Sequence, residues 1–64
     1  MPKYQIIKSE YSPYTNKEIL TIELFDNGTT NDLPTDCSAG SGAYRVGTEG
    51  LELWLFTNAG WKVI

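Results

Sequence analysis

The stretch GAYRVGTEGLELWLFTNAGWKVI, residues 42–64, decides the fold of this chain. Three short runs of mostly apolar residues alternate with two turns that contain glycine; the runs are 43–46, 51–56 and 61–64, and the turns are 47–50 and 57–60. Side chains point alternately to opposite faces of a strand, and short runs bounded by Gly and Asn are typical of hairpins. The stretch therefore predicts a three-stranded antiparallel meander.

The middle run of this meander is apolar on both faces. One face carries the leucines at positions 51, 53 and 55, and the other carries Glu52, Trp54 and Phe56. A single thin sheet does not cover both of its faces. One face therefore has to meet another part of the sheet or another chain.

The first half of the chain predicts a hairpin over residues 4–25. Residues 4–11 and 18–25 have the length and β-branching of strands, and the segment between them contains Pro13 and Asn16, which favour a turn. Lys8 and Glu10 on the first strand are typical of an edge strand, because charges discourage pairing with other chains.

The middle of the chain, residues 26–42, is a connection rich in turn-forming residues. Thr35 or Asp36 is expected to cap one helical turn that Gly40 ends. The predicted fold is therefore all-β: a small single domain over residues 1–64 with about five antiparallel strands. It consists of the hairpin 4–25, the connection 26–42 and the meander 43–64, with at most one helical turn.

Composition excludes several classes of function. The 64 residues contain one cysteine and no histidine, so an intrachain disulfide is excluded, and the commonest zinc ligand and general base are missing. The net charge is −3 and the five basic residues are scattered, which argues against a nucleic-acid partner. No apolar run is long enough to span a membrane, and no signal peptide is expected. We therefore expect no enzyme activity, no cofactor, and neither nucleic acid nor membrane as a partner.

Three polar features are weaker candidates for chemistry. Cys37 would need a neighbouring base to act as a nucleophile, so a small buried side chain is expected there. The run Gly40-Ser41-Gly42 lacks the ending of a phosphate-binding loop and precedes a strand, which favours a flexible hinge. The oxygen-bearing set lacks the ligands of a calcium loop and is expected to be a solvated turn; it comprises Asp26, Asn27, Asp32 and Asp36.

Aromatic residues leave a second function open. Sugars stack on aromatic platforms, and five rings are candidates for such a surface: Tyr14, Tyr44, Trp54, Phe56 and Trp61. In a domain of this size aromatic side chains are more often part of the core, and Trp61 in particular is expected there. A small carbohydrate-binding module for host recognition is therefore the alternative.

The second half of the chain also carries a recognisable pattern. Asp32-Leu33-Pro34-Thr35-Asp36, then Ala39-Gly40-Ser41-Gly42-Ala43-Tyr44, an apolar strand, and Asn58-Ala59-Gly60-Trp61-Lys62-Val63-Ile64 together resemble a short module of tailed-bacteriophage structural proteins. Such modules occur in small head- or tail-associated proteins and in virion fibre proteins. The chain departs from the pattern at Cys37 and in the glycines around Ser41, and a hairpin precedes the module. These departures favour a compact accessory protein over a fibre.

The resemblance implies a non-enzymatic virion or virion-assembly component that works by protein–protein contacts. Such a chain is made in the cytoplasm of its bacterial host and ends in the virion, with itself or other virion proteins as partners. An inhibitor of a host protein is a third hypothesis, which no residue favours. From the apolar content we expect association through a patch on the uncovered face, formed by Ile19, Phe25, Trp54 and Phe56.

Overall fold

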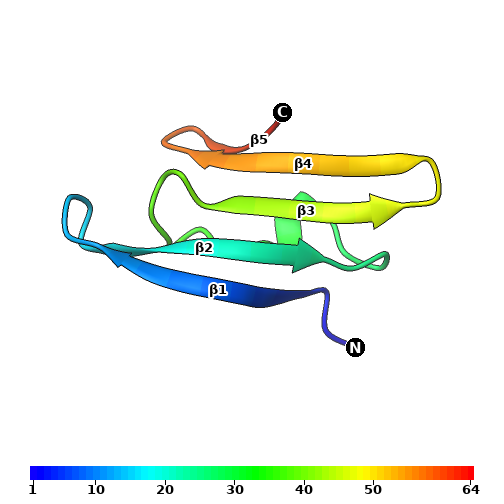
Figure 1. The fold of residues 1–64 in the computed structure, drawn as a ribbon, viewed down its shortest axis with the longest axis horizontal. Coiled ribbons are helices and arrows are strands. Elements are labelled where there is room, and N and C mark those ends of the chain that lie inside the picture. Colours follow the sequence, from blue (N-terminus) through cyan, green and yellow to red (C-terminus); the bar gives the residue numbers. More distant parts are fainter.

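The computed structural model describes every residue from Met1 to Ile64 and forms one five-stranded sheet with the strand order β1-β2-β3-β4-β5 (Figure 1). The strands are β1 (Tyr4–Ser12), β2 (Lys17–Leu24), β3 (Gly42–Gly47), β4 (Gly50–Thr57) and β5 (Gly60–Val63), and the one helical element is a 3-10 turn, η1 (Thr30–Asp32). The predicted class, a small all-β domain with at most one helical turn, is confirmed. Each strand end lies within one residue of its predicted position.

β1 and β2 form the predicted antiparallel hairpin, with Tyr4 opposite Leu24 and Ser12 opposite Lys17. Their loop spans residues 13–16 and closes tightly, because the backbone N–H of Asn16 donates a 2.9 Å hydrogen bond to the carbonyl oxygen of Ser12. Asn16 has a φ of 59°, a left-handed conformation that asparagine adopts more readily than most residues.

β1 is an edge strand and carries two features that protect such an edge. Its register shifts between Ile6 and Lys8, which marks a bulge. Lys8 and Glu10 also form an exposed ion pair with an N···O distance of 2.6 Å. The hydrogen bond between the two side chains is the main cause that raises the pKa of Lys8 and lowers the pKa of Glu10. Charges and bulges on an edge disfavour pairing with a foreign strand.

One strand pairing differs from the prediction. β2 and β3 run parallel, with Ile22 beside Ala43, whereas the other three neighbouring pairs are antiparallel. The chain leaves β2 at one end of the sheet, and segment 25–41 passes behind the sheet to the opposite end before β3 begins (Figure 1). Parallel neighbours require a long crossover connection of this kind. The sequence of this connection shows turn-forming residues but not its direction.

The helical turn also lies elsewhere than predicted. It occupies Thr30–Asp32, whereas the sequence placed it after Thr35 or Asp36. The carboxylate of Asp32 accepts a 2.8 Å hydrogen bond from the backbone N–H of Thr29, and the backbone N–H of Asp32 donates to the carbonyl oxygen of Thr29 at 2.9 Å. The backbone bond closes the turn and the Asp32 carboxylate binds the free N–H at its start, which together fix its position.

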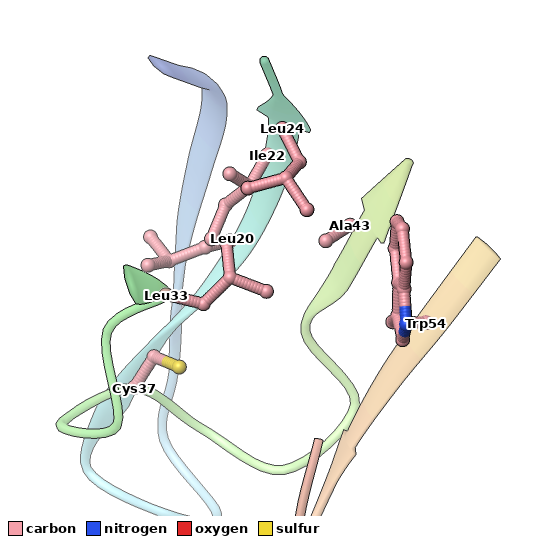
Figure 2. Packing of buried hydrophobic residues seen from close by; sticks show 7 residues of the cluster. All are labelled: Leu20, Ile22, Leu24, Leu33, Cys37, Ala43 and Trp54. Carbon is pink, nitrogen blue, oxygen red and sulfur yellow. The ribbon is translucent and has the colours of Figure 1, made fainter. Parts of the chain in front are cut away.

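The core lies between the sheet and the crossing segment 25–41 (Figure 2). Three side chains of β2 form its centre: Leu20, Ile22 and Leu24. β3 and β4 add Ala43 and Trp54, and the crossing segment adds Leu33 and Cys37. Tyr4, Phe56 and Trp61 are partly buried against this cluster.

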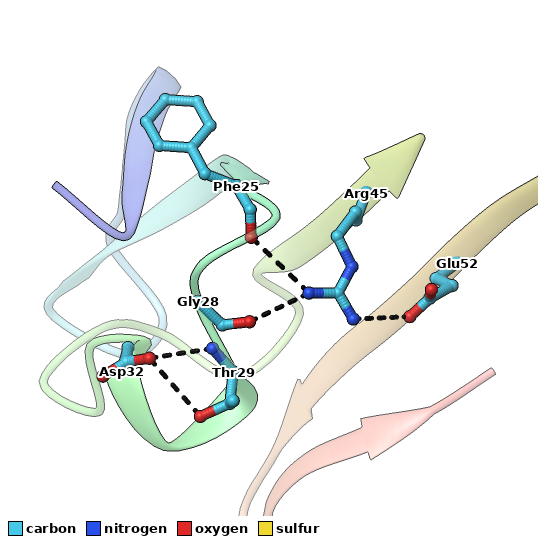
Figure 3. Close-up of polar contacts among 6 residues, drawn as sticks. All are labelled: Phe25, Gly28, Thr29, Asp32, Arg45 and Glu52. Atoms are coloured by element: carbon cyan, nitrogen blue, oxygen red, sulfur yellow. Dashed lines mark hydrogen bonds and ion pairs between the residues drawn. The ribbon is translucent and has the colours of Figure 1, made fainter. Parts of the chain in front are cut away.

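The side chain of Arg45 connects the crossing segment to β4 (Figure 3). The guanidinium of Arg45 on β3 donates a 2.9 Å hydrogen bond to the carbonyl oxygen of Gly28 and pairs with the carboxylate of Glu52 at 2.9 Å. The guanidinium carbon, Cζ of Arg45, also lies 5.5 Å from the ring centroid of Trp54. One half-buried arginine thus joins the crossing segment, β3 and β4 on the covered side of the sheet.

Candidate functional site

The four residues that the sequence placed in one interface do not share a surface. Ile19 lies on the open face of the sheet and is 37% exposed. Trp54 is buried at 7% exposure, and Phe56 is half-buried, both on the covered side. Phe25 is half-buried at the start of the crossing segment. The prediction that Trp54 and Phe56 lie outward is therefore wrong.

The reason lies in what covers the sheet. Segment 25–41 is thin and contributes only Leu33 and Cys37 to the buried cluster. Large aromatic rings are needed to fill the space between such a segment and the sheet, since an aromatic side chain buries about 150–250 Å². Glu52 shares this face and reaches the rim, where Arg45 neutralises it.

The opposite face of β3, β4 and β5 is apolar and uncovered. We call it the leucine face. Its members and their exposed fractions are Val46 68%, Leu51 59%, Leu53 40%, Leu55 40% and Ile64 74%. In the sheet register Val46 lies opposite Leu51, and the half-buried Tyr44 lies opposite Leu53. The backbone N–H of Ile64 donates a 3.0 Å hydrogen bond to the carbonyl oxygen of Leu53, which places the end of the chain beside the centre of the face.

The neighbouring half of the open face, over β1 and β2, is mainly polar, with Ile19 as an exposed apolar side chain. The amide of Gln5 donates a 2.7 Å hydrogen bond to the carboxylate of Glu23, and Lys8 pairs with Glu10. Within the apolar half Lys62, opposite Leu55, is the one charged side chain. The open face therefore divides into a mainly polar half, where two pairs of polar side chains contact each other, and an aliphatic half.

The total accessible surface of the chain is larger than expected for its mass, in keeping with an uncovered face. The accessible surface is 4474 Å² and only 11 of 64 residues are buried, whereas a folded monomer of 7.2 kDa is expected to expose about 4,100 Å². A sheet covered on one side only explains the excess. Contiguous exposed apolar surface of this kind is typical of interaction sites.

The sequence did not single out the leucine face, because both faces of β4 are apolar. The pairing of Arg45 with Glu52 was the available indication of which face of β4 is covered. Two opposite charges on neighbouring strands of one hairpin face the same side, and Trp54 shares that side with Glu52. The predicted connection offered one leucine, Leu33, to cover either face of β4.

Two of the residues considered for chemistry, Cys37 and Asp32, have structural roles. Cys37 is 3% exposed, as expected for a small buried side chain, and its Sγ lies 3.8 Å from the carbonyl oxygen of Pro34. No group of three or more His, Cys, Asp or Glu side chains is arranged to hold a metal ion. The carboxylate of Asp32, from the acidic set, caps η1. No helix has the length and hydropathy needed to cross a membrane.

The run Gly40–Gly42 is a hydrogen-bonded junction rather than the predicted hinge. Ser41 is fully buried; its hydroxyl accepts from the backbone N–H of Leu20 at 2.9 Å and donates to the carbonyl oxygen of Ser38 at 2.7 Å. Its own carbonyl oxygen accepts a 2.8 Å hydrogen bond from the backbone N–H of Phe56. One serine thus ties β2, the crossing segment and β4 together.

The five candidate rings of a sugar platform are distributed over different parts of the molecule. Trp54 is in the core, and Phe56 packs against Trp61 with ring centroids 5.1 Å apart on the covered side. Tyr44 lies on the open face, and Tyr14 is 97% exposed in the hairpin loop. The structure does not bring these rings into one flat surface.

Comparison with known proteins found no match among protein-family models, curated proteins or solved structures.

Proposed function

We propose that this chain is a non-enzymatic assembly protein that binds other protein through the leucine face, as a component of a tailed-phage virion or of its assembly. The observation that supports it is the exposure of five aliphatic side chains on one side of three adjacent strands. Burying apolar surface stabilises an association by about 25 cal/mol per Å². Covering this face with a partner would therefore contribute favourable binding free energy.

The virion setting is supported by the resemblance of residues 32–64 to structural modules of tailed phages. On this proposal the chain is made in the cytoplasm of a bacterial host and is then built into the particle, where it contacts itself or other virion proteins. Several residues that carry the resemblance have packing roles: Leu33 is in the core, Ser41 forms the junction of three segments, and Trp61 packs against the core. On this proposal these residues hold the fold, and the leucine face, from the same stretch of the chain, supplies the contact.

The test is incorporation into particles. Virions purified from infected host cells are expected to contain the chain by mass spectrometry at a fixed ratio to the capsid protein. The variant Leu51→Thr/Leu53→Thr is expected to be lost from particles, because threonine keeps the strand propensity of these positions but removes the aliphatic surface.

A matched control is available on β1. Ile6 and Ile7 are 50% and 52% exposed, comparable to Leu51 and Leu53, but they lie on β1, the edge strand farthest from β5. Ile6→Thr/Ile7→Thr is expected to be incorporated like the wild type. Absence of the wild-type chain from purified virions contradicts the proposal.

A further inference from the structure

We infer that the first partner of the leucine face is a second copy of this chain, packed face to face about a two-fold axis that passes close to Leu53. The inference rests on the proposed function and names the occupant of the same face. Three properties of the molecule support it: the area of the face, its charge, and the arrangement of its leucines.

The area of the leucine face suits a weak, reversible dimer. The fold measures 37 × 24 × 17 Å along its principal axes, so the whole sheet presents a face of 37 × 24 Å, and the leucine face is the part of it over β3, β4 and β5. A standard protein interface buries about 800 Å² on each partner and smaller interfaces are weak or transient, so a face covering three of the five strands is expected to give a weak dimer. Two sheets pack about 10 Å apart with their inner side chains interdigitating. A second copy therefore covers the aliphatic half without any rearrangement of the strands.

The charge of the face permits the approach of an identical chain. Each copy carries a net charge of −3, yet no carboxylate belongs to the leucine face. On the remainder of the open face Glu10 is paired with Lys8, and Glu23 accepts a hydrogen bond from Gln5. Lys62 is the one cation, and a lysine stem lies along apolar surface while its ammonium reaches water at the rim. Two copies thus meet here without opposing their acidic groups, whereas a strongly charged partner finds no complementary charges.

The leucines are arranged symmetrically about their central member. Leu51, Leu53 and Leu55 follow one another along β4 on the same side of the sheet, so a two-fold axis near Leu53 places Leu51 of one copy over Leu55 of the other. In such an interface residue i contacts j and j contacts i, which requires a patch that complements itself. A row of three identical side chains meets this requirement.

The test is the molecular mass of the purified full chain across concentration, measured by sedimentation velocity. We expect a reversible monomer–dimer equilibrium that ends at twice the monomer mass of 7.2 kDa. Leu51→Thr/Leu53→Thr should raise the dimer dissociation constant on the order of 100-fold or more, because four leucine contacts are lost per dimer. Ile6→Thr/Ile7→Thr should leave the constant unchanged, and near-ultraviolet circular dichroism from the buried Trp54 should show that both variants are folded.

A cross-linking experiment tests the position of the axis. Cys37 is the one cysteine and is buried, so Cys37→Ser/Leu53→Cys presents a single thiol at the proposed centre. A short bis-maleimide is expected to convert this variant to covalent dimers at concentrations where dimer is present. Cys37→Ser/Ile7→Cys, with its thiol on β1, should remain largely uncrosslinked.

The outcomes distinguish this inference from the proposed function. A chain that stays monomeric up to about 1 mM, or a dimer weakened by the β1 variant and not by the leucine variant, overturns the inference. If such a monomer still enters virions through the leucine face, the proposed function stands and the partner is another protein. A dimer that forms through this face in a chain absent from virions supports the inference and contradicts the virion role.

Discussion

The indole Nε1 of Trp61 donates a 3.0 Å hydrogen bond to the carbonyl oxygen of Pro34, across 27 positions of sequence. This contact joins β5 to the crossing segment, next to the point where Leu33 enters the core. Residues 32–36 and 58–64, which the sequence analysis grouped in one pattern, therefore meet in space. Their joint occurrence in the sequence has a packing explanation, because each supplies one partner of the same contact.

Replacing Trp61 by phenylalanine tests this contact. Trp61→Phe keeps an aromatic ring against Phe56 but removes the donor to Pro34, so the free energy of unfolding should fall by about 1 kcal/mol. Trp61→Ala should cost more, since it also removes the half-buried ring. Urea unfolding followed by the fluorescence of Trp54 measures both. Equal stability of Trp61→Phe and wild type would show that the hydrogen bond contributes nothing to the fold.

The buried hydroxyl of Ser41 is expected to be the most sensitive polar group. Ser41→Ala leaves the backbone N–H of Leu20 without its acceptor, and an unsatisfied buried donor costs about 1–3 kcal/mol. Ser9→Ala is the matched control, because Ser9 is exposed and its hydroxyl bonds the exposed carboxylate of Glu18. Thermal and urea unfolding should separate the two variants. Comparable small losses for both would contradict the role of Ser41 as a junction.

Gly28 is required because two parts of the chain approach it closely. A Cβ added there would lie 2.5 Å from the carbonyl oxygen of Lys3 and 2.8 Å from Cδ1 of Leu24. Gly28→Ala should therefore lower the free energy of unfolding by about 1–3 kcal/mol through overpacking. Gly47→Ala is the control, since its nearest neighbour is the carbonyl oxygen of Gly50 at 3.5 Å, an ordinary contact. A Gly28→Ala protein as stable as Gly47→Ala would contradict this close approach.

The ion pair on the edge strand predicts a pH effect of known sign. The pKa of Glu10 is lowered in the fold by its hydrogen bond with Lys8. The pair therefore contributes stability above the ordinary pKa of a glutamate, and this contribution is lost as the pH falls through the lowered value. The contribution is small because both groups are exposed. Carboxyl chemical shifts measured by NMR during acid titration should show the lowered pKa, and Lys8→Ala should return it to its ordinary range; an unchanged Glu10 titration in this variant would refute the pairing.

The sequence by itself determined the strands, because their causes are local. Alternation of side chains, β-branching and the placement of Gly, Pro and Asn predicted all five strands and the exposed edge at β1. The burial of Cys37 also followed from composition, since a thiol without a neighbouring base is more often a packing residue.

Tertiary structure decided the remaining features, because they depend on how distant segments meet. The direction of β3 relative to β2 is set by the path of segment 25–41 across the sheet, and turn-forming residues do not encode a path. The same path decided which side of β4 is buried. Both sides are apolar, so the choice depended on where Arg45 finds the carbonyl oxygen of Gly28 and on which rings fill the space beneath Leu33. Once those contacts form, alternation along the strand turns Trp54 inward and leaves Leu51, Leu53 and Leu55 facing solvent.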